Sequence, residues 1–216
     1  KDTSLVHFIG KDNIVFHTII FPMMLMEHGD YILPENVPAN EFMNLEGEKI
    51  STSRNWAVWL HEYLNDFPNM QDELRYCLIT NLPENKDSDF SWKDFQQKNN
   101  NELVAILGNY INRVFVLCDK FFDKKVPKPL DENLDNEIFS ELDELKGKVE
   151  LSIQNFKFRE AMSYVMDVAR LGNKYLTDTE PWKIFEENPE RVKGIIHNSV
   201  QIAVSYTHLR AHETSL

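Results

Sequence analysis

Residues 7–17 read His-Phe-Ile-Gly-Lys-Asp-Asn-Ile-Val-Phe-His, a strand-like run that ends at a glycine and leads into a predicted helix over 12–28. Glycine has no side chain, so the backbone at Gly10 can come close to a ligand. Asp12, at the start of the helix, can cap it or accept hydrogen bonds from a ribose. Taken alone, this pattern is more typical of a capped helix, and His17 is more typical of a core histidine.

A second stretch, Gly-Glu-Lys-Ile-Ser-Thr-Ser at 47–53, follows a predicted strand at 41–45 and indicates a hairpin arm that opens into a loop. Its hydrogen-bond donors are the ammonium of Lys49 and the hydroxyls of Ser51, Thr52 and Ser53. Such donors can close over a leaving pyrophosphate as negative charge builds on it. By itself the loop is more typical of a surface turn, because lysine, serine and threonine are common residues of turns.

The composition limits the class of protein. The chain has 216 residues, of which 42% are hydrophobic and 12% aromatic, enough for one large domain or two small ones. No apolar run of about 18 residues occurs, so we expect neither a membrane span nor a membrane partner. Cys77 and Cys118 are far apart and lack a Cys-x-x-Cys partner, so we expect core thiols in a reducing compartment rather than a disulfide or a zinc site.

The charge limits the partners. A net charge of −12 argues against a general nucleic-acid binder, and we expect no DNA partner. Any contact with RNA must be local. One candidate basic patch consists of Lys120, Lys124, Lys125 and Lys128. The same lysines also fit a solvated helix end.

The pattern of the chain changes near residue 90. Before it, short strand-like runs alternate with helical runs at 12–28, 56–65 and 71–82, which indicates an α/β unit. After it, apolar residues recur every three or four positions, which indicates a helix bundle. The predicted bundle helices cover 92–123, 133–155, 158–176 and 188–205, with turns at 124–131 and 178–182.

The first bundle helix carries two polar residues of interest. Its apolar stripe consists of Leu103, Leu107, Tyr110, Val114, Leu117 and Phe121. Asn109 and Arg113 fall nearly opposite this stripe, one turn apart, which leaves them free to meet a ligand or simply to face solvent. Trp182 follows a proline in the 178–182 turn. Its indole can stack on an unpaired base or can plug the packing of the bundle.

These pieces occur in the order and at the distances found in the methionyl-tRNA synthetase family of class I aminoacyl-tRNA synthetases, which residues 5–204 resemble. In that family a Phe-Ile-Gly-Lys-Asp strand and helix precede a mobile Lys-Met-Ser-Lys-Ser loop. This chain reads Lys-Ile-Ser-Thr-Ser, with Thr52 in place of the second lysine, a variant associated with the archaeal-like branch.

The resemblance implies roles for the residues of the first unit. Gly10 and Asp12 would hold the adenosine ribose, His17 would border the methionine side-chain pocket, and Met43 would contact adenine through its backbone. The ATP-binding loop would consist of Lys49, Ser51, Thr52 and Ser53. Lys49 and Thr52 would take the catalytic part, facing the phosphates.

The resemblance also implies roles for the bundle. The family reads the anticodon with an asparagine and an arginine at this spacing and with a tryptophan. Asn109, Arg113 and Trp182 match all three, so the implied RNA partner is tRNA(Met).

The implied fold is an α/β remnant, the C-terminal half of a class I Rossmann-type catalytic domain, followed by an all-α anticodon-binding helix bundle. We expect the catalytic part at 1–66 with the loop at 49–53, a connector at 67–90 and the bundle at 91–204. Residues 205–216 show no helical stripe and resemble a translated cloning adapter. For that reason we do not interpret His208 or His212 as ligands.

The implied activity is a ligase that uses ATP with Mg²⁺ to activate methionine and then transfers it to tRNA in the cytoplasm. The first nucleotide-binding strand, a His-Ile-Gly-His-type motif and a zinc insertion are expected upstream, so we expect no metal site here and no activity from these residues alone. The oligomeric state stays open. A stand-alone tRNA-binding module and another class I synthetase are the alternatives.

Overall fold

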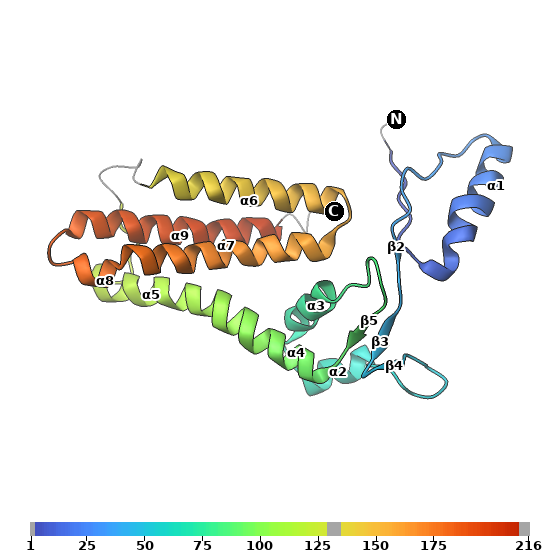
Figure 1. Ribbon diagram of the computed structural model, residues 1–216, viewed down its shortest axis with the longest axis horizontal. Coiled ribbons are helices and arrows are strands. Elements are labelled where there is room, and N and C mark those ends of the chain that lie inside the picture. The colour runs from blue at the N-terminus through green and yellow to red at the C-terminus, as the bar shows by residue number, and fades with distance from the viewer. Residues whose placement is uncertain (1–2, 129–134, 212–216) are drawn as a thin grey trace. The chain divides into compact units, whose positions relative to one another are not determined.

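The computed structural model describes residues 3–128 and 135–211 and forms two compact units (Figure 1). Unit 1 runs up to Phe95 and includes the turn Phe156–Arg159. Unit 2 comprises Gln96–Asn155 and the chain from Glu160 onward. The residues predicted as a connector, 67–90, belong to unit 1. Each unit has its own hydrophobic core.

Unit 1 contains two small sheets. In the first, β1 (Ile9–Gly10) and β2 (Ala39–Asn40) are parallel. In the second, β3 (Met43–Leu45) lies between β4 (Glu48–Lys49), which is antiparallel to it, and β5 (Ser88–Phe90), which is parallel. The β3–β4 hairpin confirms the predicted arm. β5 was not predicted, because the short run Ser-Asp-Phe carries no alternating pattern and reads as a turn.

The predicted strand at 5–9 is extended and runs beside residues 35–40. The amide of Glu35 donates to the carbonyl of Leu5 at 2.8 Å, and the amide of His7 donates to the carbonyl of Asn36 at 3.0 Å. Regular pairing is confined to its end, at β1. The strand therefore ends at Gly10, as the sequence indicated.

The helical elements of unit 1 follow the predicted ranges, with one late start. They are the 3₁₀ turn η1 (Lys11–Asn13), the π-helical stretch η2 (Phe16–Ile20), α1 (Phe21–His28), α2 (Leu60–Asp66) and α3 (Gln71–Thr80). Helix α2 begins after the predicted start at 56. The reason is that Trp56 pairs with Ser51 through two backbone hydrogen bonds of 2.9 Å, which hold it in an extended bridge.

The core of unit 1 lies between the β3–β5 pair and helices α2 and α3. It consists of Leu45, Tyr63, Leu74, Cys77, Phe90 and Phe95. In contrast, η2 and α1 contain no buried residue although they are rich in apolar side chains. The exposed apolar side chains there include Phe16, Ile19, Met23, Met24 and Met26. Contiguous apolar surface of this kind is typical of an interaction face.

Unit 2 is a helix bundle. Helix α4 (Trp92–Lys98), whose residues up to Phe95 belong to unit 1, continues through the π-helical stretch η3 (Asn99–Gly108) into α5 (Asn109–Phe122). The bundle is completed by α6 (Asn136–Gln154), α7 (Phe158–Thr179), α8 (Pro181–Ile184) and α9 (Pro189–Ala211). Figure 1 shows α5, α6, α7 and α9 side by side. The predicted α/β unit followed by a helix bundle is therefore confirmed.

The core of the bundle uses the predicted stripe of α5. Tyr110, Val114 and Leu117 are buried together with side chains from α6, α7 and α9. The Tyr110 hydroxyl donates to the carbonyl of Ser199 on α9 at 2.6 Å. Cys118 is also buried, and burial raises the pKa of its thiol. Cys77 and Cys118 are both free and buried, which confirms the prediction of core thiols.

The last helix departs from the prediction. Helix α9 continues to Ala211, so the expectation that 205–211 would not be helical was wrong. The helical signal was weak there because His, Arg and Thr interrupt the apolar spacing. The expected start of α6 at 133, the end of the predicted 124–131 turn, and His212 with the rest of the tail lie outside the described residues.

A polar network holds the start of α6 against α7 and α9. The Asp135 carboxylate accepts two hydrogen bonds from the Arg191 guanidinium, at 2.6 and 2.8 Å, and one from the Tyr175 hydroxyl at 2.6 Å. Burial opposes the charge on Asp135, but the hydrogen bonds from Arg191 and Tyr175 outweigh it and lower the pKa of the carboxyl. The same pairing raises the pKa of Arg191.

We expect Asp135→Asn to lower the free energy of unfolding by about 2 kcal/mol at pH 7, because Arg191 loses its charged partner. A depressed folded-state pKa stabilises the fold above the ordinary carboxyl pKa of about 4, and this contribution is lost as the pH falls through the folded-state pKa. The difference between wild type and variant should therefore shrink as the pH falls below about 4. Urea unfolding at pH 7, 5 and 3 measures it, with the exposed Asp143→Asn as the control. A difference that stays constant with pH would rule out this role.

Candidate functional site

The two motifs singled out in unit 1 meet at the ring of Phe42. The ammonium of Lys11 lies 4.5 Å from the ring centroid, and the ammonium of Lys49 lies 5.7 Å from it. Both distances are within the range of a cation–π contact. Phe42 precedes β3, and Lys49 ends β4, so the hairpin brings the loop back toward the Gly10 junction. Phe42 was not singled out from the sequence.

The two lysines are in different electrostatic situations. Lys11 pairs with Asp87 at 2.8 Å and with Glu41 at 2.5 Å, and these hydrogen bonds raise its pKa. The Lys11 hydrogen bond, together with the backbone amide of Phe42, lowers the pKa of Asp87. Lys49 is exposed and has no ion pair with any residue that the structure describes. It is therefore the lysine whose charge can meet a ligand.

The carboxylate of Asp12 lies over Gly10. A Cβ atom on Gly10 would lie 2.8 Å from Oδ1 of Asp12, closer than real Cβ contacts. The Asp12 side chain therefore folds over the glycine, is exposed, and has no hydrogen-bond partner among residues 3–128 and 135–211. The pair presents an exposed carboxylate beside a backbone that a ligand can approach. This arrangement fits a hydroxyl-bearing ligand such as a ribose.

The hydroxyl-rich loop is closed at its base. The Ser51–Trp56 bridge joins its two ends, and the Trp56 indole donates to the carbonyl of Leu45 on β3 at 3.0 Å. The Ser51 and Ser53 hydroxyls lie 3.2 Å apart. Thr52 is exposed at the tip. The loop thus presents hydroxyl groups beyond Lys49 on a base anchored by Trp56.

Met43 and His17 have different surroundings. Met43 begins β3, where it is the register partner of Ser88 on β5, and its side chain packs against the core of unit 1. His17 lies in η2, with its ring centroid 5.1 Å from that of His7 and 6.4 Å from that of Phe21. The Nδ1 atoms of the two histidines are 3.4 Å apart. His7 was not singled out from the sequence.

In unit 2, Asn109 and Arg113 converge on Asn173 of α7. The Asn109 amide donates to Oδ1 of Asn173 at 3.3 Å. The Arg113 guanidinium donates to the backbone carbonyl and to Oδ1 of Asn173, both at 3.2 Å, and to the Thr177 hydroxyl at 3.3 Å. Both residues therefore contact α7, whereas the sequence predicted them on the face nearly opposite the apolar stripe. They lie on the flank of α5, where α7 packs, rather than directly opposite the core.

Asn173 is itself fixed. Its amide donates to the carbonyl of Ile106 at 2.9 Å and to that of Ala169 at 3.1 Å. The side chain thus links α7 to the α5 helix and orients both predicted binding residues. Neither Asn173 nor Thr177 was predicted, because polar residues one turn apart on a helix look the same as a solvated face.

Trp182 joins this cluster from α8. The Cζ atom of Arg113 lies 5.7 Å from the centroid of the indole, and Trp182 is 39% exposed. Asn109 and Arg113 therefore form one surface with Trp182, which is distant from them in the sequence. It offers amide and guanidinium donors beside a partly open aromatic face, the set of groups that recognises an unstacked base.

Some kinds of site are not found in the described part of the chain. It holds no group of three or more His, Cys, Asp and Glu side chains placed to bind a metal ion. Within the same residues, no helix combines the length and the apolar character needed to cross a bilayer.

Comparison with protein families gives two matches. Residues 1–115 match the model of tRNA synthetases class I (M). The chain belongs to this family of class I tRNA synthetases. Residues 127–212 match the model of the anticodon binding domain of methionyl tRNA ligase. That second match contains Trp182 and Asn173, and the first contains Asn109, Arg113 and both motifs of unit 1.

Similar proteins agree with the family. The chain is 63% identical over 205 residues to the methionine–tRNA ligase of Cytophaga hutchinsonii, covering 94% of this chain and 30% of that protein. It is 59% identical over 206 residues to the methionine–tRNA ligase of Flavobacterium johnsoniae, covering 95% of this chain and 29% of that protein. The chain thus spans less than a third of the length of these relatives.

A solved structure has the same fold. The Mycobacterium tuberculosis methionyl-tRNA synthetase in complex with methionyl-adenylate superposes with a TM-score of 0.84 at 25% identity. The match covers 94% of this chain and 40% of that chain.

Proposed function

We propose that these residues are part of a methionine–tRNA ligase, which activates methionine with ATP and transfers it to tRNA(Met) in the cytoplasm. The observation that carries the proposal is that two ammonium groups lie over the ring of Phe42, in a chain of this family. One belongs to Lys11, between Gly10 and Asp12, and the other to Lys49 of the loop. Relatives about 60% identical are methionine–tRNA ligases, which supports the choice of amino acid.

In the activation step, a carboxylate oxygen of methionine attacks the α-phosphorus of ATP and pyrophosphate leaves. Gly10 and Asp12 hold the ribose of ATP, and the backbone of Met43 contacts the adenine. Lys49 and the hydroxyls of Ser51, Thr52 and Ser53 close over the departing pyrophosphate, where charge develops. The protein contributes positioning and charge, not a nucleophile. His17, held by His7 and Phe21, borders the pocket for the methionine side chain.

Mg²⁺ enters with ATP. The groups placed to face the phosphates are an ammonium and three hydroxyls, which are donors to anionic oxygens rather than carboxylate ligands for a cation. The metal ion would therefore be held mainly by the phosphates of ATP. Zinc, as expected from the sequence, would belong to a part of the longer protein outside these residues.

The bundle selects the tRNA. Asn109 and Arg113 donate hydrogen bonds to a base of the anticodon, and the open face of Trp182 stacks on it. Stacking on an aromatic side chain contributes about 1–3 kcal/mol per base. With a net charge of −12, the chain relies on this local surface and not on general attraction to phosphates.

The exposed apolar face of η2 and α1 fits a part of a larger catalytic domain. A helix that is apolar on all sides is normally buried. The relatives are more than three times as long as this chain. We propose that, in a protein of that length, the rest of the catalytic domain covers this face. The segment 14–26, which contains His17, would then lie inside the complete active-site domain.

The proposal is tested with the full-length protein. We expect methionine-dependent exchange of pyrophosphate with ATP, and charging of tRNA(Met) with methionine but not with leucine or valine. Exchange that depends on leucine or valine would assign the chain to another class I synthetase. Binding of tRNA without any exchange would instead favour a tRNA-binding module.

We expect Asn173→Ala to weaken binding of the anticodon stem-loop of tRNA(Met) by about 10-fold, because Asn109 and Arg113 lose the group that orients them. Fluorescence titration at fixed salt measures it. Ser163→Ala, on an exposed position of the same helix, is the matched control and should bind as wild type. Unchanged binding by the Asn173 variant would remove its positioning role.

A further inference from the structure

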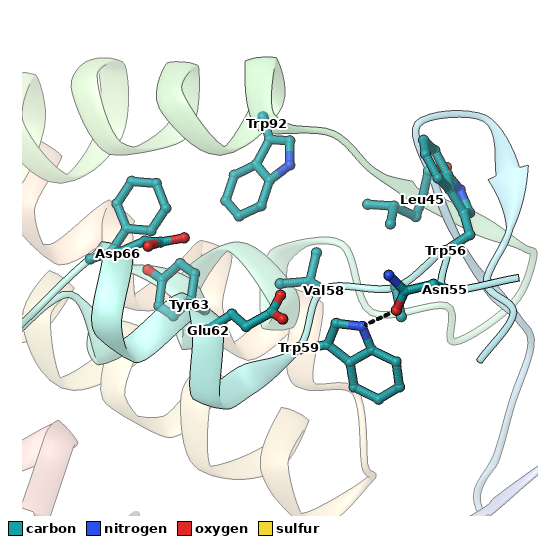
Figure 2. A pocket seen from close by; sticks show the side chains of 11 residues that line it. Leu45, Asn55, Trp56, Val58, Trp59, Glu62, Tyr63, Asp66 and Trp92 are labelled. Atoms are coloured by element: carbon teal, nitrogen blue, oxygen red, sulfur yellow. Dashed lines mark hydrogen bonds between the residues drawn. The ribbon is translucent and has the colours of Figure 1, made fainter. Parts of the chain in front are cut away.

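Unit 1 has an open cleft of about 250 Å³ beside helix α2, separate from the surface at Phe42 (Figure 2). Its walls include the rings of Trp59, Tyr63, Phe67 and Trp92. Glu62 and Asp66 supply the two carboxylates of the lining. Nothing in the proposed ligase reaction uses these side chains.

The aromatic walls are held in place. The Trp92 centroid lies 5.6 Å from that of Phe67 and 6.3 Å from that of Tyr63, with interplanar angles of 20° and 11°. The Tyr63 hydroxyl donates to the carbonyl of Met70 at 2.7 Å, and the Trp59 indole donates to Asn55 at 2.8 Å. The polar atoms of Tyr63 and Trp59 are therefore engaged. Tyr63 is buried and stacks on Phe67 and Trp92, so the accessible aromatic surface of the cleft comes mainly from Trp59 and Trp92, which is 39% exposed.

The two carboxylates lie one turn apart on α2. In Figure 2 the side chains of Glu62 and Asp66 lie on the side of the helix that faces Trp92. Like charges at this spacing destabilise a helix by a few tenths of a kcal/mol. Neither carboxylate has an ion-pair partner within the described part of the chain. A cation bound between them would remove the repulsion.

We propose that this cleft binds the guanidinium group of an arginine side chain that belongs to another polypeptide segment. A guanidinium is planar and stacks on aromatic faces, and its fork of donors matches carboxylates. The two carboxylates repel phosphate, which excludes a nucleic acid as the occupant. The open cleft accepts one side chain rather than a folded surface. This inference does not depend on the ligase proposal.

The test uses the 216-residue chain with ¹⁵N-labelled tryptophan, titrated with N-acetyl-arginine amide, whose only charge is the guanidinium. The chain has 4 tryptophans, of which Trp182 belongs to unit 2 and serves as an internal control. We expect the indole signals of Trp92 and Trp59 to shift and saturate while that of Trp182 stays fixed. N-acetyl-norleucine amide should bind at least fivefold more weakly.

Two double variants complete the test. Glu62→Gln with Asp66→Asn should weaken binding at least fivefold. Glu137→Gln with Glu141→Gln removes an acidic pair at the same spacing on α6 and should leave binding unchanged. The proposal is overturned if the shifts do not saturate, if the norleucine compound binds equally well, or if the α2 variant binds like wild type. Binding of agmatine without binding of the acetylated arginine amide would also overturn it, since the ligand would then be a free cation.

Discussion

Replacing Lys49 by alanine in the full-length enzyme is expected to slow methionyl-adenylate formation by about 100-fold or more. Removing one group that stabilises developing charge typically costs a factor of 10²–10³. The loss should be large here because Lys11, the other lysine at Phe42, is paired with Glu41 and Asp87. Thr52 stands at the position where the family usually has a second lysine, so Lys49 is the one lysine of the sequence 47–53.

The rate is measured as methionine-dependent exchange of pyrophosphate with ATP. Lys86→Ala removes an exposed lysine of unit 1 outside the loop and should exchange at the wild-type rate. Lys49→Arg should recover part of the activity, since it restores the charge. If Lys49→Ala stayed within a few-fold of wild type, the assignment of the loop to the pyrophosphate would be lost.

The second large effect, a loss of stability, is expected when Gly172 is replaced by alanine. A Cβ atom on this residue of α7 would lie 2.3–2.7 Å from ring atoms of Tyr110. Tyr110 is buried, and its hydroxyl is fixed on the carbonyl of Ser199, so the ring cannot move away. We therefore expect Gly172→Ala to lower the free energy of unfolding of unit 2 by about 3 kcal/mol, the upper part of the range for overpacking.

Gly147 offers the matched control for this experiment. It also lies within a helix, but a Cβ atom there meets nothing within 4 Å. Gly147→Ala should raise the free energy of unfolding by roughly 0.5–1 kcal/mol, the usual gain when alanine replaces glycine inside a helix. Urea unfolding followed by circular dichroism measures both variants. Equal stability of the two variants would show that the α5–α7 packing is looser than described.

The bundle was predictable because its helices are long and each buries one stripe. Spacing of three and four residues identified the α5 stripe, and Tyr110, Val114 and Leu117 are buried as expected. The β3–β4 hairpin followed from the Glu46-Gly47 turn. Strand β5 did not, because its pairing with β3 depends on residues more than forty positions away. The late start of α2 depends likewise on a bridge between Trp56 and Ser51 that no local pattern encodes.

In the candidate sites too, some residues were predictable from the sequence and others depend on tertiary packing. The motifs located Gly10, Lys49, Arg113 and Trp182 through the family resemblance. The sequence did not reveal the groups that join them, Phe42 in unit 1 and Asn173 in unit 2. Each is an ordinary residue in its local context and acquires a role only when tertiary packing brings two segments together.

Binding of an anticodon stem-loop to this chain at fixed moderate salt tests the assignment of Asn109, Arg113 and Trp182 directly. It compares the stem-loop of tRNA(Met) with one whose first anticodon base is changed, for wild type and for Trp182→Ala. We expect wild type to prefer the natural stem-loop by about 1–3 kcal/mol and the variant to lose the preference. Equal binding of the two stem-loops by wild type would contradict the assignment of Asn109, Arg113 and Trp182 to the anticodon.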